Sequence, residues 1–393
     1  MSTESIVIVA ARRTPIGAFQ GALSNAAATE LSAAASRACI ADAGIDAGDV
    51  NEAIIGCVLS AGVGQAPARQ AALAAGLPEH VGCMTINKVC GSGMKSVMLA
   101  HDLILAGSAN VVLAGGMESM SNAPYLLPKA RGGYRMGHQE VIDHMFYDGL
   151  QDAYDQNMMG VFAENTARRY DHTREQQDAF SIQSVERARA AAAAGKFDAE
   201  LVPVTVRNRR DEVTVAADEE PERADLARVQ KLRPAFAKDG TVTAASSSTI
   251  ADGAASLILM SASEAQRRGI KPLARLVGSA GHSHEPEWFT TAPINAVRSL
   301  WEKVGWSADD VDLFEINEAF ACVTLAAMSE LGLDHAKVNV NGGACALGHP
   351  IGATGARIIT TLIHALRERG AKRGVAALCI GGGEALAIAI EAL

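Results

Sequence analysis

The chain has 393 residues, of which 49% are hydrophobic and 20% are charged, with 37 glycines and 12 prolines. This length and composition indicate a globular protein of two or three domains and exclude a disordered or fibrous chain. The formal net charge of −9 argues against general nucleic-acid binding, which needs a basic surface.

The N-terminal segment begins MSTESIVIVAARRTPIG, and its apolar run over 6–11 has the length of a strand. It lacks the basic region and long apolar core of a signal peptide. No run of about 20 apolar residues predicts a membrane span. The seven cysteines form no CxxC pair, so neither a zinc ribbon nor a disulfide framework is indicated. We therefore expect a cytoplasmic protein with free thiols.

Short apolar segments that alternate with helical patterns predict an α/β protein. The expected strands, in chain order, are 6–9, 54–59, 111–113, 273–277, 313–316 and 376–380, and residues 159–197 are expected to be helical. Apolar strands flanked by glycines and separated by helices are typical of a sheet that is covered on both faces.

Two blocks of sequence recur in the same order near the C-terminus. Residues 41–58 resemble 302–320, with Gly44 matching Gly305. Residues 90–116 resemble 348–382 at nearly the same spacing, and each block has a Gly-rich turn, an amphipathic helix and a strand that ends in glycines. We interpret this as an internal duplication. Two α/β halves packed side by side would give five alternating layers.

The stretch between these blocks has no counterpart in the second half. The predicted division is an N-terminal half over 1–120, an inserted loop domain over 121–249, a return of the N-terminal half over 250–272 and a C-terminal half over 273–393. The basic residues of the insert include Arg207, Arg209, Arg210, Arg223, Arg228, Lys231 and Arg233. They indicate either a solvated surface lobe or a lobe that anchors an anionic substrate.

Cys90 lies in NKVCGSGMKS, after a strand-like segment and at the start of an expected helix. The free N–H groups and the positive end of the helix dipole are expected to lower the pKa of its thiol and to favour the thiolate. The same N–H groups can hold a developing oxyanion. A buried structural cysteine is the alternative interpretation of this motif taken alone.

His349 lies in GHPIGATG, before a proline and just ahead of an expected helix. The repeat gives it nearly the position that Cys90 has in the first half. If a pseudo-twofold axis relates the two halves, these two side chains come close together. A cysteine and a histidine in contact supply a nucleophile and its activating base.

Two further polar residues stand at the ends of expected strands. Cys379 ends an apolar strand and precedes three glycines, and strand ends of this kind bind ligands in α/β sheets. Asn317, in EINEAFA, can orient a water or a carbonyl oxygen, or it can simply cap a helix. His282 and His284 form an HxH pair without other ligands nearby, so we expect no metal site.

Together, the motifs VCGSG, NEAFA, GHPIGATGA and CIGGG resemble the thiolase family, in family order and over nearly the whole chain. The resemblance implies a thiolase-like five-layered αβαβα fold and acyl transfer between thioesters of coenzyme A, without a cofactor. It implies that Cys90 takes the acyl group, that His349 activates it, and that Cys379 moves the α-proton of the second acyl-CoA. One oxyanion hole would consist of His349 and a water held by Asn317. The backbone N–H groups of Cys90 and Gly381 would form the other.

The segments YLLPKARGGYRMGHQEVIDHMFYDGL and KLRPAFAKDGTVTAA resemble the loop of short-chain, tetramer-forming thiolases and their CoA-binding stretch. This likeness assigns to the acyl-CoA the residues Leu150, Met158, Met159, Arg223, Phe236, Ala244, Ser248, Phe289 and Phe320. The chain departs from the family where Met158 replaces a histidine, Pro221 replaces an arginine and Trp288-Phe289 replace Met-Gly. These departures concern acyl-chain specificity.

The sequence thus predicts a homotetrameric acetyl-CoA C-acetyltransferase of fatty acid metabolism, with small acyl-CoA partners and neither nucleic acid nor membrane as a partner. It would condense two acetyl-CoA, or acyl-CoA and acetyl-CoA, by a reversible ping-pong reaction through acyl-Cys90. One alternative is a degradative thiolase for longer or branched chains. A nucleotide-dependent oxidoreductase is a second, although GxGxxG is missing after the first strand. A catalytically idle scaffold is the third.

Overall fold

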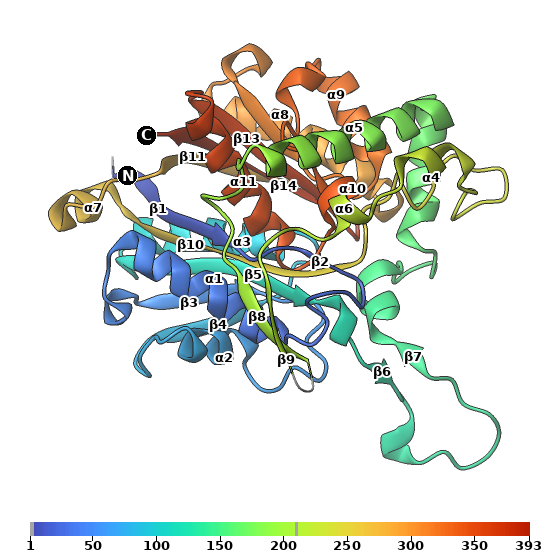
Figure 1. Ribbon diagram of the computed structural model, residues 1–393, viewed down its shortest axis with the longest axis horizontal. Coiled ribbons are helices and arrows are strands. Elements are labelled where there is room, and N and C mark those ends of the chain that lie inside the picture. The colour runs from blue at the N-terminus through green and yellow to red at the C-terminus, as the bar shows by residue number, and fades with distance from the viewer. Residues whose placement is uncertain (1–3, 209–210) are drawn as a thin grey trace.

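The computed structural model describes residues 4–208 and 211–393, so the predicted basic residues Arg209 and Arg210 lie outside the described part. One mixed sheet runs through the molecule (Figure 1). Its strands lie in the order β12 (Leu313–Ile316), β13 (Arg373–Ile380), β14 (Glu384–Ala392), β11 (Ala274–Ser283), β1 (Ile6–Arg13), β10 (Ala251–Ser261), β5 (Val111–Ser119), β3 (Glu52–Gly56) and β4 (Gly82–Ile86), with β2 (Gly17–Ala18) paired to β10.

The strand order is symmetric about its centre, where β1 and β11 pair antiparallel. On either side follow β10 and β14, each antiparallel to its inner neighbour, and then β5 and β13, again antiparallel. The next strands, β3 and β12, are both parallel to their inner neighbours. β4 has no counterpart among the strands of the described C-terminal half. This arrangement has the twofold symmetry that the sequence repeat predicts.

Helices cover the sheet in three layers, each with its own apolar core. Between the two halves lie α3 (Ser92–Leu105) and α11 (Thr354–Glu368), which bury their apolar residues against strands of both halves. The outer face of the N-terminal half carries α1 (Ala28–Ala43) and α2 (Pro67–Ala74). The outer face of the C-terminal half carries α8 (Ala292–Val304) and α9 (Ala321–Leu331). The three helix layers alternate with the two halves of the sheet, so the five predicted layers are present.

The two central helices approach each other at their first turns, and this contact brings the Cys90 turn next to the His349 loop. A Cβ atom on Gly93 would lie 2.8 Å from the backbone nitrogen of Ala356, and one on Gly355 would overlap the backbone of Met94. Only glycine permits two backbones to come this close. These two glycines, one in each half, thus set the distance between the Cys90 motif and the His349 motif.

The middle of the chain forms an arm and a set of helices (Figure 1). The arm, with β6 (Tyr125–Leu126) and β7 (Ile142–Asp143), projects from the body.

The remaining helices and strands of the described chain are α4 (Met159–Arg169), α5 (Arg174–Ala193), β8 (Val204–Asn208), β9 (Asp211–Val215), α6 (Glu220–Arg223), α7 (Ala262–Arg268) and α10 (Ala344–Leu347). Short 3₁₀ or π turns span Ala47–Asp49, Met120–Asn122, Ala130–Gly132, Phe146–Leu150, Leu226–Lys231, Pro286–Thr291, Ala308–Asp310 and His335–Lys337. None of the described helices has the length and apolarity needed to cross a bilayer.

Several predicted boundaries are wrong. The strands predicted over 6–9, 111–113, 273–277 and 376–380 are too short, since β1, β5, β11 and β13 are longer. Two other predicted elements are too long. The helix predicted over 159–197 is two helices, because Asp171 has a positive φ of 51° and Thr173 begins a new helix by accepting a hydrogen bond from the N–H of Gln176. The strand predicted over 54–59 ends at Gly56, because the chain turns there toward the buried side chain of Glu118.

Candidate active site

Cys90 lies in a tight turn between β4 and α3. Val89, directly before it, has a φ of 46°, a conformation that a β-branched residue adopts only when its surroundings impose it. The hydroxyl of Ser92 holds this turn: it accepts from the N–H of Lys88 at 2.8 Å and donates to the carbonyl of Val89 at 2.7 Å. Backbone strain at this point fixes the position of the sulfur.

Burial raises the pKa of Cys90 to about 11. The backbone N–H groups of Gly381 and of Cys90 itself lower it, and the nearby carboxylate of Glu118 raises it. The sequence predicts a lowered pKa at this helix start, and that prediction is wrong because the loss of hydration outweighs the two N–H groups. At neutral pH this side chain is a thiol that needs a base.

His349 supplies a base whose tautomer is fixed by its loop. Its Nδ1 lies 2.6 Å from the hydroxyl of Thr354, and that hydroxyl donates its hydrogen to the carbonyl of Pro350 at 3.0 Å. The hydroxyl therefore accepts from Nδ1–H, and the lone pair of the ring lies on Nε2. Nε2 is buried and has no hydrogen-bond partner among the described residues.

Burial, with a smaller contribution from Arg357, lowers the pKa of His349 to about 3. Cys90 and His349 therefore rest as a neutral thiol and a neutral imidazole, and not as an ion pair. An imidazole with an open Nε2 can take the thiol proton at the moment the sulfur attacks.

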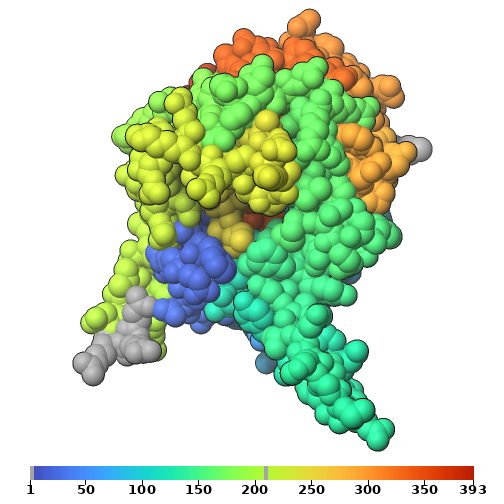
Figure 2. Space-filling view, turned by 90° about the vertical axis from the view of Figure 1, so that its right-hand side faces the viewer, coloured from blue at the N-terminus to red at the C-terminus, as the bar shows by residue number. Residues whose placement is uncertain are grey.

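Cys90, His349 and Gly381 line one apolar cavity of ≈ 280 Å³. Its other lining residues are Phe146, Gly149, Leu150, Met158, Met159, Gly160, Phe236, Ser247, Ser248, Ile250, Phe289, Ala319, Phe320 and Ile351. Figure 2 shows a hollow bounded by green and yellow segments from the middle of the chain, with red atoms of the C-terminal half at its bottom. Most of the residues predicted to contact the acyl-CoA thus surround the thiol.

Arg223 and Ala244 lie elsewhere, in a second cavity of ≈ 360 Å³. Arg228 and Thr249 also line it, and Arg223 is paired with Glu219 at 2.9 Å. Ser247 and Ser248 line the first cavity, whereas Ala245 and Thr249, close to them in sequence, line the second. One short segment therefore separates the apolar cavity from a cavity that carries arginines.

Cys379 lies behind the wall of the first cavity. It is fully buried at the end of β13, in an apolar cluster with Phe162, Phe289 and Phe320. Burial, with the charge of Cys90 as the next contribution, raises the pKa of Cys379 well above its ordinary value. The two sulfurs are thus close enough to influence each other's protonation, although only Cys90 lines the cavity.

Asn317 follows β12 and is 1% exposed. Its backbone N–H donates to the carbonyl of Ala377 at 2.9 Å, but neither polar atom of its side chain has a partner among the described residues. A buried amide in this state requires a water or a ligand. Next to it, the carboxylate of Glu318 accepts from Ser184 at 2.7 Å and from Asn339 at 2.8 Å, which fixes this segment.

Family models account for almost all of the chain. The thiolase N-terminal domain matches residues 6–263, and the thiolase C-terminal domain matches residues 270–392. The chain belongs to the thiolase family. The resemblance predicted from the motifs is confirmed, and the alternative of a nucleotide-dependent oxidoreductase is not supported.

Several full-length relatives of this thiolase share a name. The acetyl-CoA acetyltransferase of Chromobacterium violaceum is 51% identical over 388 residues, which cover 98% of this chain and 99% of the relative. That of Rhizobium meliloti is 50% identical over 394 residues, with 100% of both chains covered. The crystal structure of the Bacillus anthracis acetyl-CoA acetyltransferase matches with a TM-score of 0.97 and 45% identity, over 99% of each chain. The predicted fold class is therefore confirmed.

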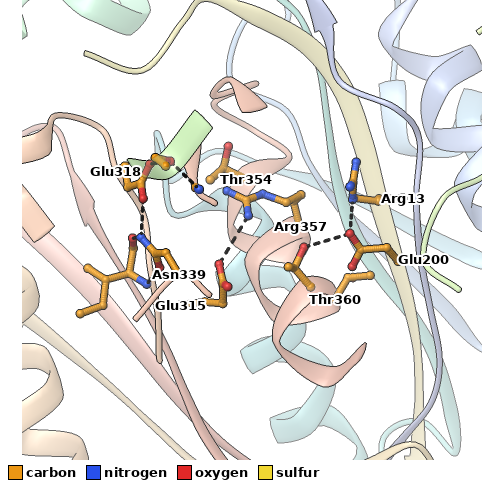
Figure 3. A network of polar contacts seen from close by, with 12 residues as sticks. Arg13, Glu200, Glu315, Glu318, Asn339, Thr354, Arg357 and Thr360 are labelled. Carbon is orange, nitrogen blue, oxygen red and sulfur yellow. Dashed lines mark hydrogen bonds and ion pairs between the residues drawn. The ribbon is translucent and has the colours of Figure 1, made fainter. Parts of the chain in front are cut away.

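Sequence reasoning misses several buried charged residues of this thiolase, of which Arg357 acts on the pKa of His349 and Glu118 on that of Cys90. Figure 3 shows Arg13 beside Glu200, and Arg357 facing Glu315 at 3.6 Å. Glu118 is a further buried carboxylate. A charged residue inside an otherwise apolar segment, such as the glutamate of VVLAGGMES, is the signal that could have identified them.

Proposed function

We propose that this thiolase is an acetyl-CoA acetyltransferase, which joins two acetyl-CoA to acetoacetyl-CoA and CoA and also catalyses the reverse cleavage. The observation that carries the proposal is the neutral thiol of Cys90 and the open Nε2 of His349 in one apolar cavity. The names of relatives that are about half identical over their full length support the choice of acetyl transfer.

In the cleavage direction, Nε2 of His349 takes the proton of the Cys90 thiol while the sulfur attacks the 3-keto carbon. The bond between C2 and C3 then breaks, and the thiol of Cys379 protonates C2, which releases acetyl-CoA. A thiol whose pKa is raised by burial holds its proton at neutral pH and can donate it to an enolate. The first half-reaction leaves an acetyl group on Cys90.

In the second half-reaction, the thiol of CoA loses its proton to the Cys379 thiolate and attacks acetyl-Cys90. The sulfur of Cys90 leaves and recovers its proton from the imidazolium of His349, which a pKa of about 3 makes a strong acid. All bonds and protons balance within these three side chains, so the reaction as proposed uses no cofactor. Condensation follows the same steps in reverse.

Two sets of donors would stabilise the oxyanions. The backbone N–H groups of Cys90 and Gly381 lie close enough to the sulfur to lower its pKa, so they can also reach the carbonyl oxygen that is attacked there. A water on the unpartnered amide of Asn317, together with His349, would hold the enolate oxygen. The residues that line the apolar cavity would hold the acyl group and pantetheine, and Arg223 in the second cavity would face the CoA phosphates.

The test is the thiolysis of acetoacetyl-CoA by CoA, with mass spectrometry of the protein after addition of acetyl-CoA alone. We expect turnover and an acetyl adduct on Cys90, and neither in Cys90→Ala. An absence of the adduct in the unmodified protein would support the idle scaffold instead. Turnover of six-carbon or longer 3-ketoacyl-CoA at an equal or higher rate would contradict the short-chain assignment.

We also propose that four copies associate as a dimer of dimers through the arm between β6 and β7. Apolar side chains on this arm and beside it face solvent in the single chain, among them Tyr125, which is 67% exposed, and Met136, which is 91% exposed. Exposed apolar groups gathered on one projection are typical of an interface between proteins.

A further inference from the structure

Glu118, on β5, is fully buried and holds two loops of the candidate site. Its carboxylate accepts from the backbone N–H groups of Val58 at 3.1 Å, Leu59 at 3.0 Å and Gly352 at 2.9 Å. Val58 and Leu59 belong to the segment that follows β3, and Gly352 lies shortly after His349 in the same loop. A single side chain thus ties the loop of the base to a segment from the other half.

The carboxylate fits closely against the His349 loop. A Cβ atom on Gly352 would lie 2.7 Å from an oxygen of Glu118 and 2.5 Å from the carbonyl of Met117. Leu59, which is tethered, and Ile351, which precedes the tethered Gly352, pack in one apolar cluster against which Cys90 is placed. Ile351 also lines the cavity of the thiol. The distance between the loop and Cys90 therefore depends on this carboxylate.

The groups that face the carboxylate are donors. Besides the three N–H groups, the thiol of Cys57 lies 3.8 Å away. An ionised carboxylate satisfies these donors, whereas a protonated acid would bring a hydrogen for which only the sulfur of Cys57, a weak acceptor, is at hand. Burial, offset in part by the three N–H groups, raises the pKa of Glu118 to about 7.

The elements that pack against Glu118 carry other titratable groups. Cys57 comes from the segment after β3, and Cys90 from the turn before α3. On the neighbouring strand β10, Asp252 is engaged with Ser121 at 2.9 Å. From the α11 side come the N–H of Gly352 and, in the same loop, His349. Cys90 and His349 have pKa values of about 11 and about 3, so neither titrates near neutrality.

We propose that Glu118 is a positioning residue of this thiolase: as a carboxylate it holds the His349 loop and the Val58–Leu59 segment against Cys90, and its ionisation sets the acid limit of activity. The proposal rests on the proposed function, because the activity in question is acyl transfer to Cys90. Protonation below about pH 7 would release an N–H group and loosen the loop that carries the base.

The first test is the rate at which acetyl-CoA acetylates Cys90 between pH 5.5 and 8.5, a half-reaction without free CoA as a substrate. In the unmodified protein we expect the rate to fall about tenfold per unit below pH 7. Glu118→Gln should be slower at pH 8 by about tenfold or more, and its rate should not change between pH 6 and 8. Glu118→Asp keeps the charge and should keep the acid-side fall.

A second measurement separates this role from simple loss of structure. The charge of Glu118 raises the pKa of Cys90, so Glu118→Gln should contain more Cys90 thiolate. Each unit by which the pKa of Cys90 falls gives about tenfold more thiolate, but each thiolate is then a weaker nucleophile. Alkylation of Cys90 by iodoacetamide at pH 8 should therefore become about threefold faster per unit. Faster alkylation together with slower acetylation is the expected result, whereas general damage would slow acetylation and expose buried cysteines such as Cys39.

Glu164→Gln is the matched control, because Glu164 is also a buried carboxylate that accepts from two backbone N–H groups, those of Thr241 and Val242, each at 2.9 Å. It should keep the acid-side midpoint of the unmodified protein. The inference is overturned if Glu118→Gln keeps the acid-side fall, if its Cys90 is alkylated no faster, or if Glu118→Asp loses the fall. Failure of the unmodified protein to acetylate Cys90 at any pH would instead contradict the proposed function.

Discussion

The protonation state of Cys90 decides how the proposed reaction begins. Many cysteine nucleophiles rest as a thiolate beside an imidazolium, but here burial places the pKa of the thiol at about 11 and that of the imidazole at about 3. The proton can leave the sulfur only when a carbonyl is in place to take up the developing charge. Such a site protects its thiol from reagents that attack free thiolates.

This neutral pair leads to a prediction for His349→Asn. The rate of Cys90 alkylation at pH 8 should change less than threefold, because a neutral imidazole does not stabilise a resting thiolate, whereas acetylation by acetyl-CoA should fall by about 10²–10⁴. Both rates are measured by mass spectrometry of the Cys90 peptide. A parallel fall of both rates would show that the pair rests as ions.

Thr354 is predicted to act through the orientation of His349. Thr354→Val keeps the shape but removes the hydroxyl that accepts from Nδ1–H, so a buried donor loses its partner. We expect a loss of about 1–2 kcal/mol of unfolding free energy and a fall of about tenfold in kcat. Thr354→Ser keeps the hydroxyl and should restore most of both. Equal losses in the two variants would exclude this role.

At the scale of secondary structure, the contact between the first turns of α3 and α11 carries both motifs of the site. Gly93→Ala places a methyl group 2.8 Å from a backbone nitrogen, so one helix must shift. We expect a cost of about 1–3 kcal/mol, measured by urea denaturation, together with a lower kcat.

The matched control for this contact is Gly48→Ala, where the added methyl group meets nothing nearer than 3.8 Å. It should leave both the stability and kcat unchanged. If Gly93→Ala destabilises the protein but keeps the full kcat, the contact contributes to the fold and does not set the distance between the two motifs.

Much of the sheet could be predicted from the sequence, and two long strands, β10 and β14, are missed for the same physical reason. Strands rich in branched residues, such as 313–316, are correctly predicted. β10 and β14 are missed because ADGAASLILMS and EALAIAIEA contain many alanines, which favour helices when no neighbouring strand is known. β4 is predicted in part, since the strand-like segment before Cys90 overlaps its last residues. Pairing with distant strands decides these segments, and local sequence does not report it.

The candidate site was accessible to sequence reasoning wherever a motif or the repeat marked a residue. Cys90 and His349 stand at matched positions, and the structure brings both to one cavity. The pKa of Cys90 could not be predicted, since burial is a property of the complete fold. Arg223 and Ala244 were assigned by likeness alone, and they line a different cavity from the thiol. Glu118 was missed because its partners are backbone groups far away in the chain.

At the scale of the whole molecule, the two halves share a fold but divide the chemistry between them. The first half provides Cys90 and the second His349, at corresponding ends of the paired helices α3 and α11. The arm and the helices α4 and α5 follow β5 of the first half, and the described residues after β13 of the second half form no such elements.

The arm leads to the last prediction, which concerns the assembly of the molecule. Met136→Asp puts a charge where an apolar side chain is 91% exposed, so it should disrupt an interface made by the arm and convert tetramers to dimers. Val213→Asp alters another exposed apolar side chain, on β9, and should leave the mass unchanged. Sedimentation velocity measures both masses. A tetramer that persists in Met136→Asp, or an unmodified protein that is already dimeric, would contradict assembly through the arm.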